Sequence, residues 1–302
     1  MPKPISEYTL RDWKRLRPLI HAFKTWRYHR VDRRYMPRPA RAGDPAAIAS
    51  GIAGRDVLVT IAFNDSEAIG WQTQLIRHYV PRVLHVIADN SSDETAAAAI
   101  AREAARGGRP YLRLPKNPWR GFSRSHGIAL NWVWRNVLRP GAPRAFGFID
   151  DDLFPMAPDD PFAALKSQDL FGSVRHAGER WFLWAGFCMF RFDAVKDKEL
   201  DFGQDWFNGL DTGGGNWEVL YRYADRGALQ EPRLASEPYK AGIALEDGPI
   251  DWCGAWLHEV GTMGNAALAV EKRGAVAELL APHLRAAQRD APTADSSDAE
   301  AR

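Results

Sequence analysis

The chain has 302 residues, a formal net charge of +2 and a hydrophobic fraction of 45%. Its length suits one large domain or two small ones with a packed core, and its small net charge gives no reason to expect nucleic-acid binding. No run is long and apolar enough to span a membrane, and we expect no signal peptide. The two cysteines, Cys188 and Cys253, are far apart in apolar surroundings, which favours a reducing, cytoplasmic location over a disulfide framework or a zinc site.

Residues 1–50 differ in composition from the rest of the chain. Basic residues far outnumber acids between Arg11 and Arg41. Large apolar residues recur at helical spacing, namely Leu10, Trp13, Leu16, Leu19, Ile20, Phe23 and Trp26. The pattern predicts a basic amphipathic helix that ends before Pro37, followed by a linker over 40–54. Two interpretations stay open. One is peripheral contact with the inner face of an anionic membrane. The other is packing of the apolar face on the main domain, which we favour because it needs no partner.

Residues 55–285 alternate between apolar runs and helical segments. We expect strands over 57–63, 83–88, 111–114 and 146–150, and helices over 68–79, 96–106 and 123–138. This alternation predicts an α/β domain with a mostly parallel sheet flanked by helices. No glycine-rich dinucleotide loop and no phosphate-binding Lys-Ser/Thr loop follows the first strand, which argues against a Rossmann dehydrogenase and a P-loop NTPase.

Polar clusters follow the first, second and fourth expected strands, at 64–65, 89–90 and 150–152. Since the carboxyl ends of parallel strands border one crevice, these clusters should face each other. Asp150 and Asp152 stand two residues apart and point the same way on an extended chain. Two such carboxylates make a seat for Mg²⁺ or Mn²⁺. The alternative is a solvated acidic turn, but the place at the sheet edge favours the metal site, with Asp151 turned away.

Five stretches of the chain match family motifs in order and spacing. They are the strand over 57–64, the turn Asp89-Asn90-Ser91-Ser92-Asp93-Glu94-Thr95, the stretch 117–127, the triplet Asp150-Asp151-Asp152 and the strand over 187–191. They are similar to the first strand, the "D-x-S-x-D-x-T" turn, the "N-x-G … A-R-N-x-G" stretch, the "D-x-D" and the following strand of one family. In this, the chain resembles the family-2 glycosyltransferases of the GT-A fold over about residues 55–230.

The resemblance implies a nucleotide-sugar donor site built from Asn64, Asp89, Arg124 and Asp150. Asp89 would accept a hydrogen bond from the nucleotide base, and Arg124 would lie near the donor. Asp150 and Asp152 would hold Mn²⁺ or Mg²⁺ and, around it, the diphosphate. From the residues alone, Asp89 is open to a second interpretation as a helix N-cap, and Arg124 to one as an ion-paired helical residue.

Two further details concern a helix N-cap and the stretch 117–127. For the helix after the second strand, Ser91 or Ser92 is better placed as N-cap than Asp89. The sequence Ser125-His126 stands where the family has Asn, a departure that bears on the donor site and leaves the fold expectation unchanged.

In the carboxyl half, Asp211 is the candidate general base. The resemblance implies a carboxylate at this place that takes the proton from the acceptor hydroxyl, although Leu210 replaces the first acid of the family's "E-D" pair. The alternative role for Asp211 is a turn residue, with Asp205 and Glu218 as reserve candidates. Strands are expected over 171–175 and 180–192, and a helix over 218–226.

The end of the core contains a late histidine, His258. The resemblance implies that it completes the metal site beside the two carboxylates, and the alternative is a hydrogen-bonded structural residue. Residues 286–302 are rich in Ala, Asp, Ser and Thr without an apolar period, which predicts a disordered tail.

Taken together, the sequence predicts a GT-A-like domain over 55–285 with an amino-terminal helical arm. The resemblance implies a metal-dependent, hexosyltransferase-type glycosyltransferase that moves a sugar from a nucleoside-diphosphate sugar to a hydroxyl on a glycan or a lipid-linked acceptor, with inversion. One alternative is a nucleotidyltransferase, although the acidic sequence 64–67 is a poor cradle for a triphosphate. The other is a catalytically degenerate sugar- or partner-binding module.

Overall fold

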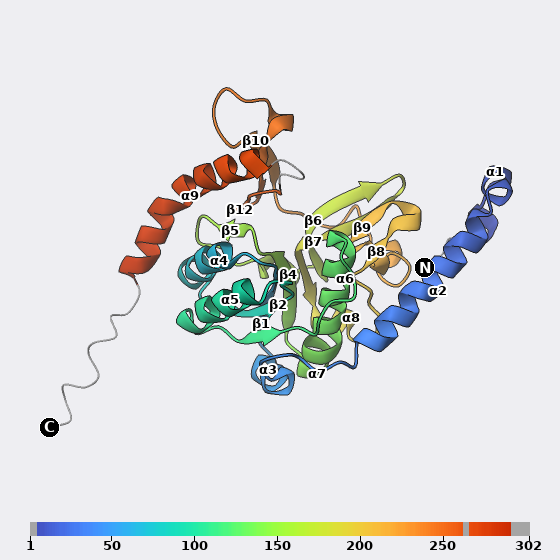
Figure 1. Cartoon of the computed structure of the whole chain (residues 1–302), viewed down its shortest axis with the longest axis horizontal. Helices are drawn as coiled ribbons and strands as arrows, with labels where there is room; N and C mark the ends of the chain where they lie inside the picture. Colours follow the sequence, from blue (N-terminus) through green and yellow to red (C-terminus); the bar gives the residue numbers. More distant parts are fainter. Residues whose placement is uncertain (1–4, 262–265, 291–302) are drawn as a thin grey trace.

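A six-stranded sheet forms the centre of the computed structural model, which describes residues 5–261 and 266–290 (Figure 1). Its strand order is β3-β2-β1-β4-β7-β6. The strands are β1 (Asp56–Ala62), β2 (Leu84–Asp89), β3 (Tyr111–Arg113), β4 (Ala145–Asp150), β6 (Leu170–Ala177) and β7 (Arg180–Arg191). The first four run parallel, and β7 pairs antiparallel with both β4 and β6. The predicted α/β class with a mostly parallel sheet is confirmed.

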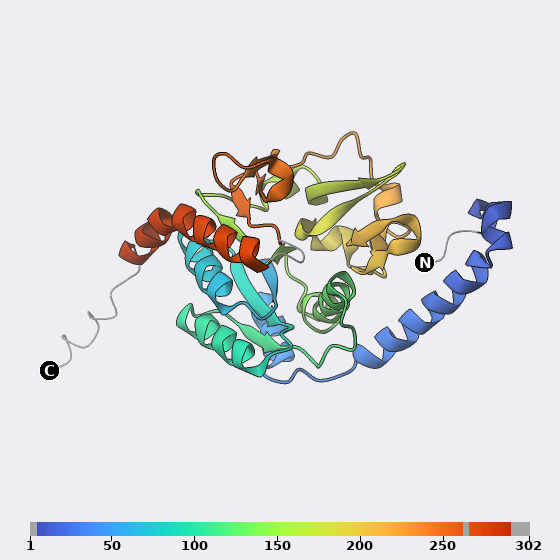
Figure 2. The ribbon, with the colours of Figure 1, turned by 45° about the horizontal axis from the view of Figure 1, so that its top comes forward.

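Helices cover both faces of this sheet (Figures 1 and 2). On one side lie α4 (Ser66–Tyr79) and α5 (Glu94–Arg106), and on the other lies α6 (Phe122–Val133), which continues as a π-helical turn over Trp134–Leu138. Alternate residues of β1 serve the two layers: Leu58 packs with α4, whereas Val57 and Val59 pack in the cluster that includes α6. Burial on both faces explains why β1 is apolar at successive positions.

Aspartates, not serines, begin the two helices that follow β1 and β2. The Asp65 carboxylate accepts from Ala68 N at 2.9 Å, and that of Asp93 accepts from Ala96 N at 2.7 Å. The expectation that Ser91 or Ser92 caps the second helix is therefore wrong, because both serines lie in the preceding turn, where the Ser91 hydroxyl accepts from the backbone N–H of Asn64.

The carboxyl part adds a second sheet of order β10-β11-β12-β5. Its strands are β10 (Leu234–Pro238), β11 (Pro249–Cys253), β12 (Trp256–His258) and β5 (Leu153–Pro155). Since β5 directly follows the acidic triplet, this sheet brings distant residues of the chain back to the end of β4. A hairpin of β8 (Gln204–Asp205) and β9 (Leu210–Thr212) packs beside β7.

The helix expected over 218–226 is absent, which is a correction to the sequence prediction. In its place are 3₁₀ turns over Gly214–Asn216 and Tyr221–Tyr223. Tyr221 is fully buried, with its ring 5.2 Å from that of Trp181 on β7. Tertiary packing of this large side chain overrides the local helical pattern.

The last described helix, α9 (Ala266–Arg289), extends past residue 285, where the main domain was expected to end. Residues 286–289, expected at the start of a disordered tail, belong to it, because Ala287 continues the buried face of Val276 and Leu280 against α4. The rest of the expected tail, 291–302, lies outside the described residues.

The amino-terminal arm consists of α1 (Leu10–Lys14) and α2 (Arg17–Tyr35). As predicted, the helix ends before Pro37. The expected linker contains a further helix, α3 (Pro45–Ile52), whose Ala49 and Ile52 are buried against α7 (Arg139–Gly141). The helix does contact the main domain, through Tyr28 and Tyr35. The arm's large apolar residues are exposed, so the expectation that they form this contact is wrong. Among the described residues, no helix is both long and apolar enough to cross a membrane.

Candidate active site

A cavity of about 730 Å³ opens at the carboxyl ends of β1, β2 and β4. Two hydrogen bonds join the three strand ends there: Asn64 N donates to Ser91 Oγ at 2.8 Å, and Phe63 N donates to Asp151 Oδ2 at 2.8 Å. The polar clusters predicted from the sequence therefore lie at adjacent strand ends, but Asn64, Asp65 and Asp89 do not line the cavity. Asp151 serves the turn through this bond, while Asp150 and Asp152 on either side of it also line the cavity.

A buried polar chain from α4 holds the acidic turn in place. The Gln72 side-chain amide donates to the carbonyls of Asp150 and Leu153, both at 2.8 Å. Its oxygen accepts from the Thr60 hydroxyl at 2.6 Å, and that hydroxyl lies 2.8 Å from His85 Nε2. Burial lowers the pKa of His85 to about 3, so the ring is neutral and donates to Thr60. Each hydrogen bond in this chain determines which group donates in the next one. Together the bonds hold the backbone around Asp150 in place.

Asp150, Asp152 and His258 form a cluster in which one ligand atom from each lies within 4.8 Å of the others. The histidine comes from β12 of the second sheet, and its Nε2 is 3.3 Å from Asp152 Oδ1. Its ring packs against Trp184, with 4.7 Å between ring centres. The sequence placed these three residues together only by resemblance, and the structure brings them together through the pairing of β5 with β12.

The electrostatics of this cluster show an excess of negative charge. Burial raises the pKa of the Asp150 carboxyl, and the repulsion from Asp152 adds to this effect, while His126 opposes it. Burial also acts to raise the pKa of Asp152, but the adjacent His258 outweighs it and lowers that pKa. For His258, burial acts to lower the pKa, yet Asp152 and Asp150 outweigh it, so that the pKa is raised. A cation between the carboxylates would relieve their repulsion.

The donor set fits a hard divalent ion. Two carboxylate oxygens and one imidazole nitrogen suit Mn²⁺ or Mg²⁺, with the remaining positions free for other oxygen ligands. Gly186 of β7 leaves room for two side chains of the site, because a Cβ there would lie 2.1 Å from the Trp184 ring and 2.5 Å from Asp150 Oδ2. A larger residue at this position would displace one of them.

Asp211, the candidate base, lies on β9 and lines the same cavity as the acidic turn. Gln204 donates to its Oδ1 at 2.8 Å, which orients the carboxylate and leaves the other oxygen available. Both reserve candidates lie outside this cavity. Asp205 is buried beside Arg180 and Asn208, and Glu218 is paired with Arg222. Of the three acids considered, the structure places Asp211 alone at the cavity.

Three other predicted donor residues do not line the cavity. Asp89 is fully buried: its carboxylate accepts from Ser91 N and the Tyr111 hydroxyl and pairs with Arg113 at 2.8 Å. Asn64 spans two loops through its side chain, which bonds to the turn at 92–93. Arg124 lies with its guanidinium 5.4 Å from the ring centre of Trp119. In this geometry the polar groups of Asp89 and Asn64 bond to neighbouring strands and loops and do not face the cavity.

Sequence reasoning missed several side chains that do line the cavity. Arg41, Lys116 and Arg120 supply positive charge on its wall, and His126 Nε2 lies 3.7 Å from Asp150 Oδ1. Lys116 and Arg120 flank Asn117, so the basic residues of that motif were the signal to follow. Gln72 gave no such signal, because one amide within a helix has many common roles.

No protein-family model and no curated protein matches this chain. It is similar to a mannosyltransferase from Pyrobaculum calidifontis in complex with GDP-Man and Mn²⁺, at 15% identity and a TM-score of 0.37 over 57% of this chain and 53% of that one. The chain thus spans about half the length of that neighbour.

Two further solved structures are similar over a larger share of the chain. The galactosyltransferase LgtC, in complex with donor and acceptor sugar analogues, has 12% identity and a TM-score of 0.41 over 75% of this chain and 95% of that one. Glucosyl-3-phosphoglycerate synthase from Mycobacterium tuberculosis, in complex with Mn²⁺ and UDP-glucose, has 14% identity and a TM-score of 0.41 over 81% and 85%.

Proposed function

We propose that this chain is a metal-dependent glycosyltransferase that moves a sugar from a nucleoside-diphosphate sugar to a hydroxyl acceptor with inversion. One observation carries the proposal: the Asp150, Asp152 and His258 cluster and the carboxylate of Asp211 border a single cavity of about 730 Å³. That volume lies within the range of pockets that enclose a small organic ligand.

The diphosphate of the donor belongs beside the acidic turn. Asp150, Asp152 and His258 would hold Mn²⁺ or Mg²⁺, and the chemistry that such an ion supplies is Lewis-acid stabilisation of the charge on the departing diphosphate. The cationic side chains of Lys116, Arg120 and Arg41 on the cavity wall favour the same anion. A cavity with both a cation site and basic side chains on its wall is suited to a strongly anionic donor.

The acceptor belongs near Asp211. Its carboxylate takes the proton of the acceptor hydroxyl while that oxygen forms a bond to the anomeric carbon. The bond from the anomeric carbon to the diphosphate oxygen breaks, and its electron pair leaves with the nucleoside diphosphate. Attack from the side opposite to the leaving group inverts the anomeric centre. The Gln204 amide bound to Asp211 Oδ1 keeps the carboxylate oriented during this transfer.

Metal-dependent stabilisation by nucleotide sugars tests the donor site. In a thermal-shift screen of UDP-, GDP-, CMP- and dTDP-sugars, we expect a rise in Tm for one base that requires Mn²⁺ or Mg²⁺. The double variant Asp150→Asn with Asp152→Asn should lose that rise and all turnover. An Asp193→Asn variant, which alters an exposed acid on α8 (Phe192–Val195), is the matched control. Normal turnover in the double variant would refute the proposal.

The identity of the products separates the proposed reaction from its alternatives. Release of a nucleoside diphosphate with a glycosylated acceptor supports the transferase, whereas release of pyrophosphate from a nucleoside triphosphate supports a nucleotidyltransferase. Metal-dependent donor binding without any transfer or hydrolysis supports a binding module. An Asp211→Asn variant that binds donor normally but turns over about a hundredfold or more slowly would support the base role.

A further inference from the structure

The two faces of helix α2 differ sharply in their contacts. On its inner face, the Tyr28 ring stacks on Trp119 with 5.8 Å between centres, and the Tyr35 hydroxyl donates to the Pro115 carbonyl at 3.0 Å. Further toward the amino terminus, the His21 ring lies 4.2 Å from that of Phe207. These contacts fix the arm on the main domain beside two residues, Pro115 and Trp119, that line the cavity.

The outer face of α2 exposes large apolar side chains. Between 45% and 61% of the surface of each is accessible for the N-cap Leu16 and for Leu19, Ile20, Phe23 and Trp26. Five large apolar side chains that are at least 45% exposed within three helical turns form a contiguous apolar surface, which a water-exposed helix rarely carries without a partner. We call these five residues the apolar patch of the arm.

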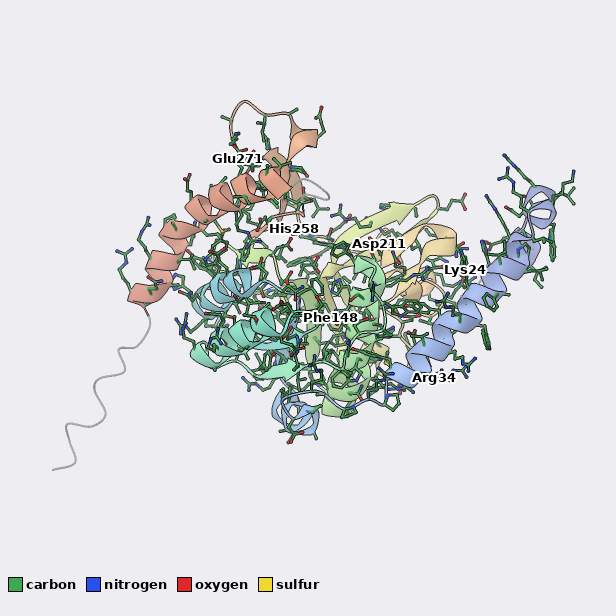
Figure 3. All side chains as sticks on the ribbon, in the orientation of Figure 1. Lys24, Arg34, Phe148, Asp211, His258 and Glu271 are labelled. Atoms are coloured by element: carbon green, nitrogen blue, oxygen red, sulfur yellow. The ribbon has the colours of Figure 1, made fainter. Side chains whose placement is uncertain are left out.

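Basic residues border the apolar patch on the same side. With 3.6 residues per turn, Arg27, Arg30 and Arg34 share the face that holds Phe23 and Trp26. The Arg30 guanidinium lies 5.3 Å from the ring centre of Trp26, and all three arginines are exposed. From residue 10 to residue 35 the chain has nine Arg and Lys and only two Asp. Figure 3 shows Lys24 and Arg34 along this helix, and Figures 1 and 2 show the arm projecting from the side of the domain.

We propose that the outer face of α2 lies on an anionic lipid bilayer. Aliphatic and Trp side chains beside arginines match the interface of such a bilayer, where acyl chains take up the apolar residues and headgroups neutralise the cations. Charged residues occur along the whole helix, so it lies along the interface and does not cross it. A second copy of the chain is a poor partner, because pairing the two arms would bring like charges together. Nucleic acid offers no hydrocarbon to cover Leu19 and Ile20.

Vesicle sedimentation with the full chain tests the proposal. We expect strong binding to vesicles of phosphatidylcholine mixed with phosphatidylglycerol, weak binding to phosphatidylcholine alone, and a loss of binding at high salt. Phe23→Ser with Trp26→Ser should weaken binding about tenfold or more. Arg27→Gln with Arg30→Gln should weaken it about fivefold per charge removed.

A matched control comes from the other end of the molecule. Val270 and Leu279 on α9 are also exposed, and Val270→Ser with Leu279→Ser should bind vesicles as the native chain does. Because all the substituted residues are exposed, unfolding midpoints should be unchanged, which separates lost binding from lost folding. The proposal is overturned if anionic vesicles do not bind the chain, or if the Phe23 and Trp26 variant binds equally well. Self-association that this variant abolishes, without vesicle binding, would assign the patch to a second copy.

Discussion

The helices α2 and α9 are the longest in the described residues, and they use their basic residues in opposite ways. In α9, Lys272 is buried and its ammonium group donates to the carbonyls of Pro249 and Val260. In α2, the arginines at 27, 30 and 34 are exposed. Figure 1 shows the two helices on opposite sides of the domain. Basic residues on a helix therefore serve as internal braces or as a surface charge, and only their tertiary surroundings decide which.

A second basic residue of α9, Arg273, supports the candidate metal site. Arg273 pairs with Asp65 at 2.7 Å and with Glu259 at 3.0 Å, and its guanidinium lies 5.4 Å from the ring centre of Trp71. Glu259 directly follows His258, so the Arg273 guanidinium holds the end of β12, which carries the histidine. Through Asp65 and Glu259, Arg273 links α9 to the start of α4 and to the end of β12.

The largest expected effect comes from removing the Arg273 guanidinium. Arg273→Met should lower the free energy of unfolding by about 3 kcal/mol, because it leaves the buried Glu259 carboxylate unpaired. It should also weaken Mn²⁺ binding about tenfold or more, because His258 loses its support. Denaturant unfolding and Mn²⁺ titration measure both effects. The matched change on the other helix, Arg34→Met, should alter the unfolding energy by less than about 0.5 kcal/mol. Equal effects of the two variants would contradict the contrast between the helices.

A second prediction concerns α4, the helix on which α9 packs. Gln72→Leu should lower the free energy of unfolding by about 2 kcal/mol, because the Thr60 hydroxyl and two turn carbonyls lose their buried partner. Metal-dependent nucleotide binding should weaken with it, since the backbone of Asp150 is no longer held. Calorimetry of the variant with and without Mn²⁺ provides the measurement. Gln74→Leu, on the same helix, is the control, and an undiminished metal response in the Gln72 variant would argue against a positioning role.

The smallest expected effect lies on the inner face of α2 and depends on pH. Burial raises the pKa of Asp32 to about 8, and repulsion from Asp201 adds to this rise. Because the folded chain holds this proton more tightly than the unfolded chain does, Asp32 lowers stability progressively as the pH rises from about 4 to about 8. Asp32→Asn removes this penalty, and its gain in unfolding energy should be larger at pH 8 than at pH 5 by about 1 kcal/mol or more.

Thermal melts at the two pH values check this expectation. The control is Asp197→Asn, which changes an exposed acid and should leave the pH dependence of the melts unaltered. A melting temperature of the Asp32 variant that follows the native chain at both pH values would show that packing of the arm on the main domain does not desolvate this carboxyl group. The inner face of α2 would then be less firmly packed than the contacts of Tyr28 and Tyr35 indicate.

Local patterns predicted the central sheet because its strands are apolar at successive positions and end in polar clusters. The same patterns predicted that Asp150 and Asp152 lie at the sheet edge, and the position of Asp211 at the cavity agrees with the resemblance. They failed over 218–226, where burial of Tyr221 overrode the helical spacing, and over 286–289, where packing on α4 extended the helix. Contacts between distant segments, such as β5 with β12, leave no periodic trace in a sequence.

By itself, the sequence determined the alternating α/β architecture and the acidic turn after β4. The spacing of apolar residues and the polar residues at strand ends are local features of a sequence. The tertiary structure alone decided that Asp89 faces Arg113 and not the cavity, and that Gln72 holds the acidic turn. It also decided which face of the arm packs on the domain. The apolar and basic face of such a helix can pack inward or face the solvent, depending on which face meets complementary side chains. The aromatic inner face found Trp119 and Pro115, so the apolar patch was left on the surface.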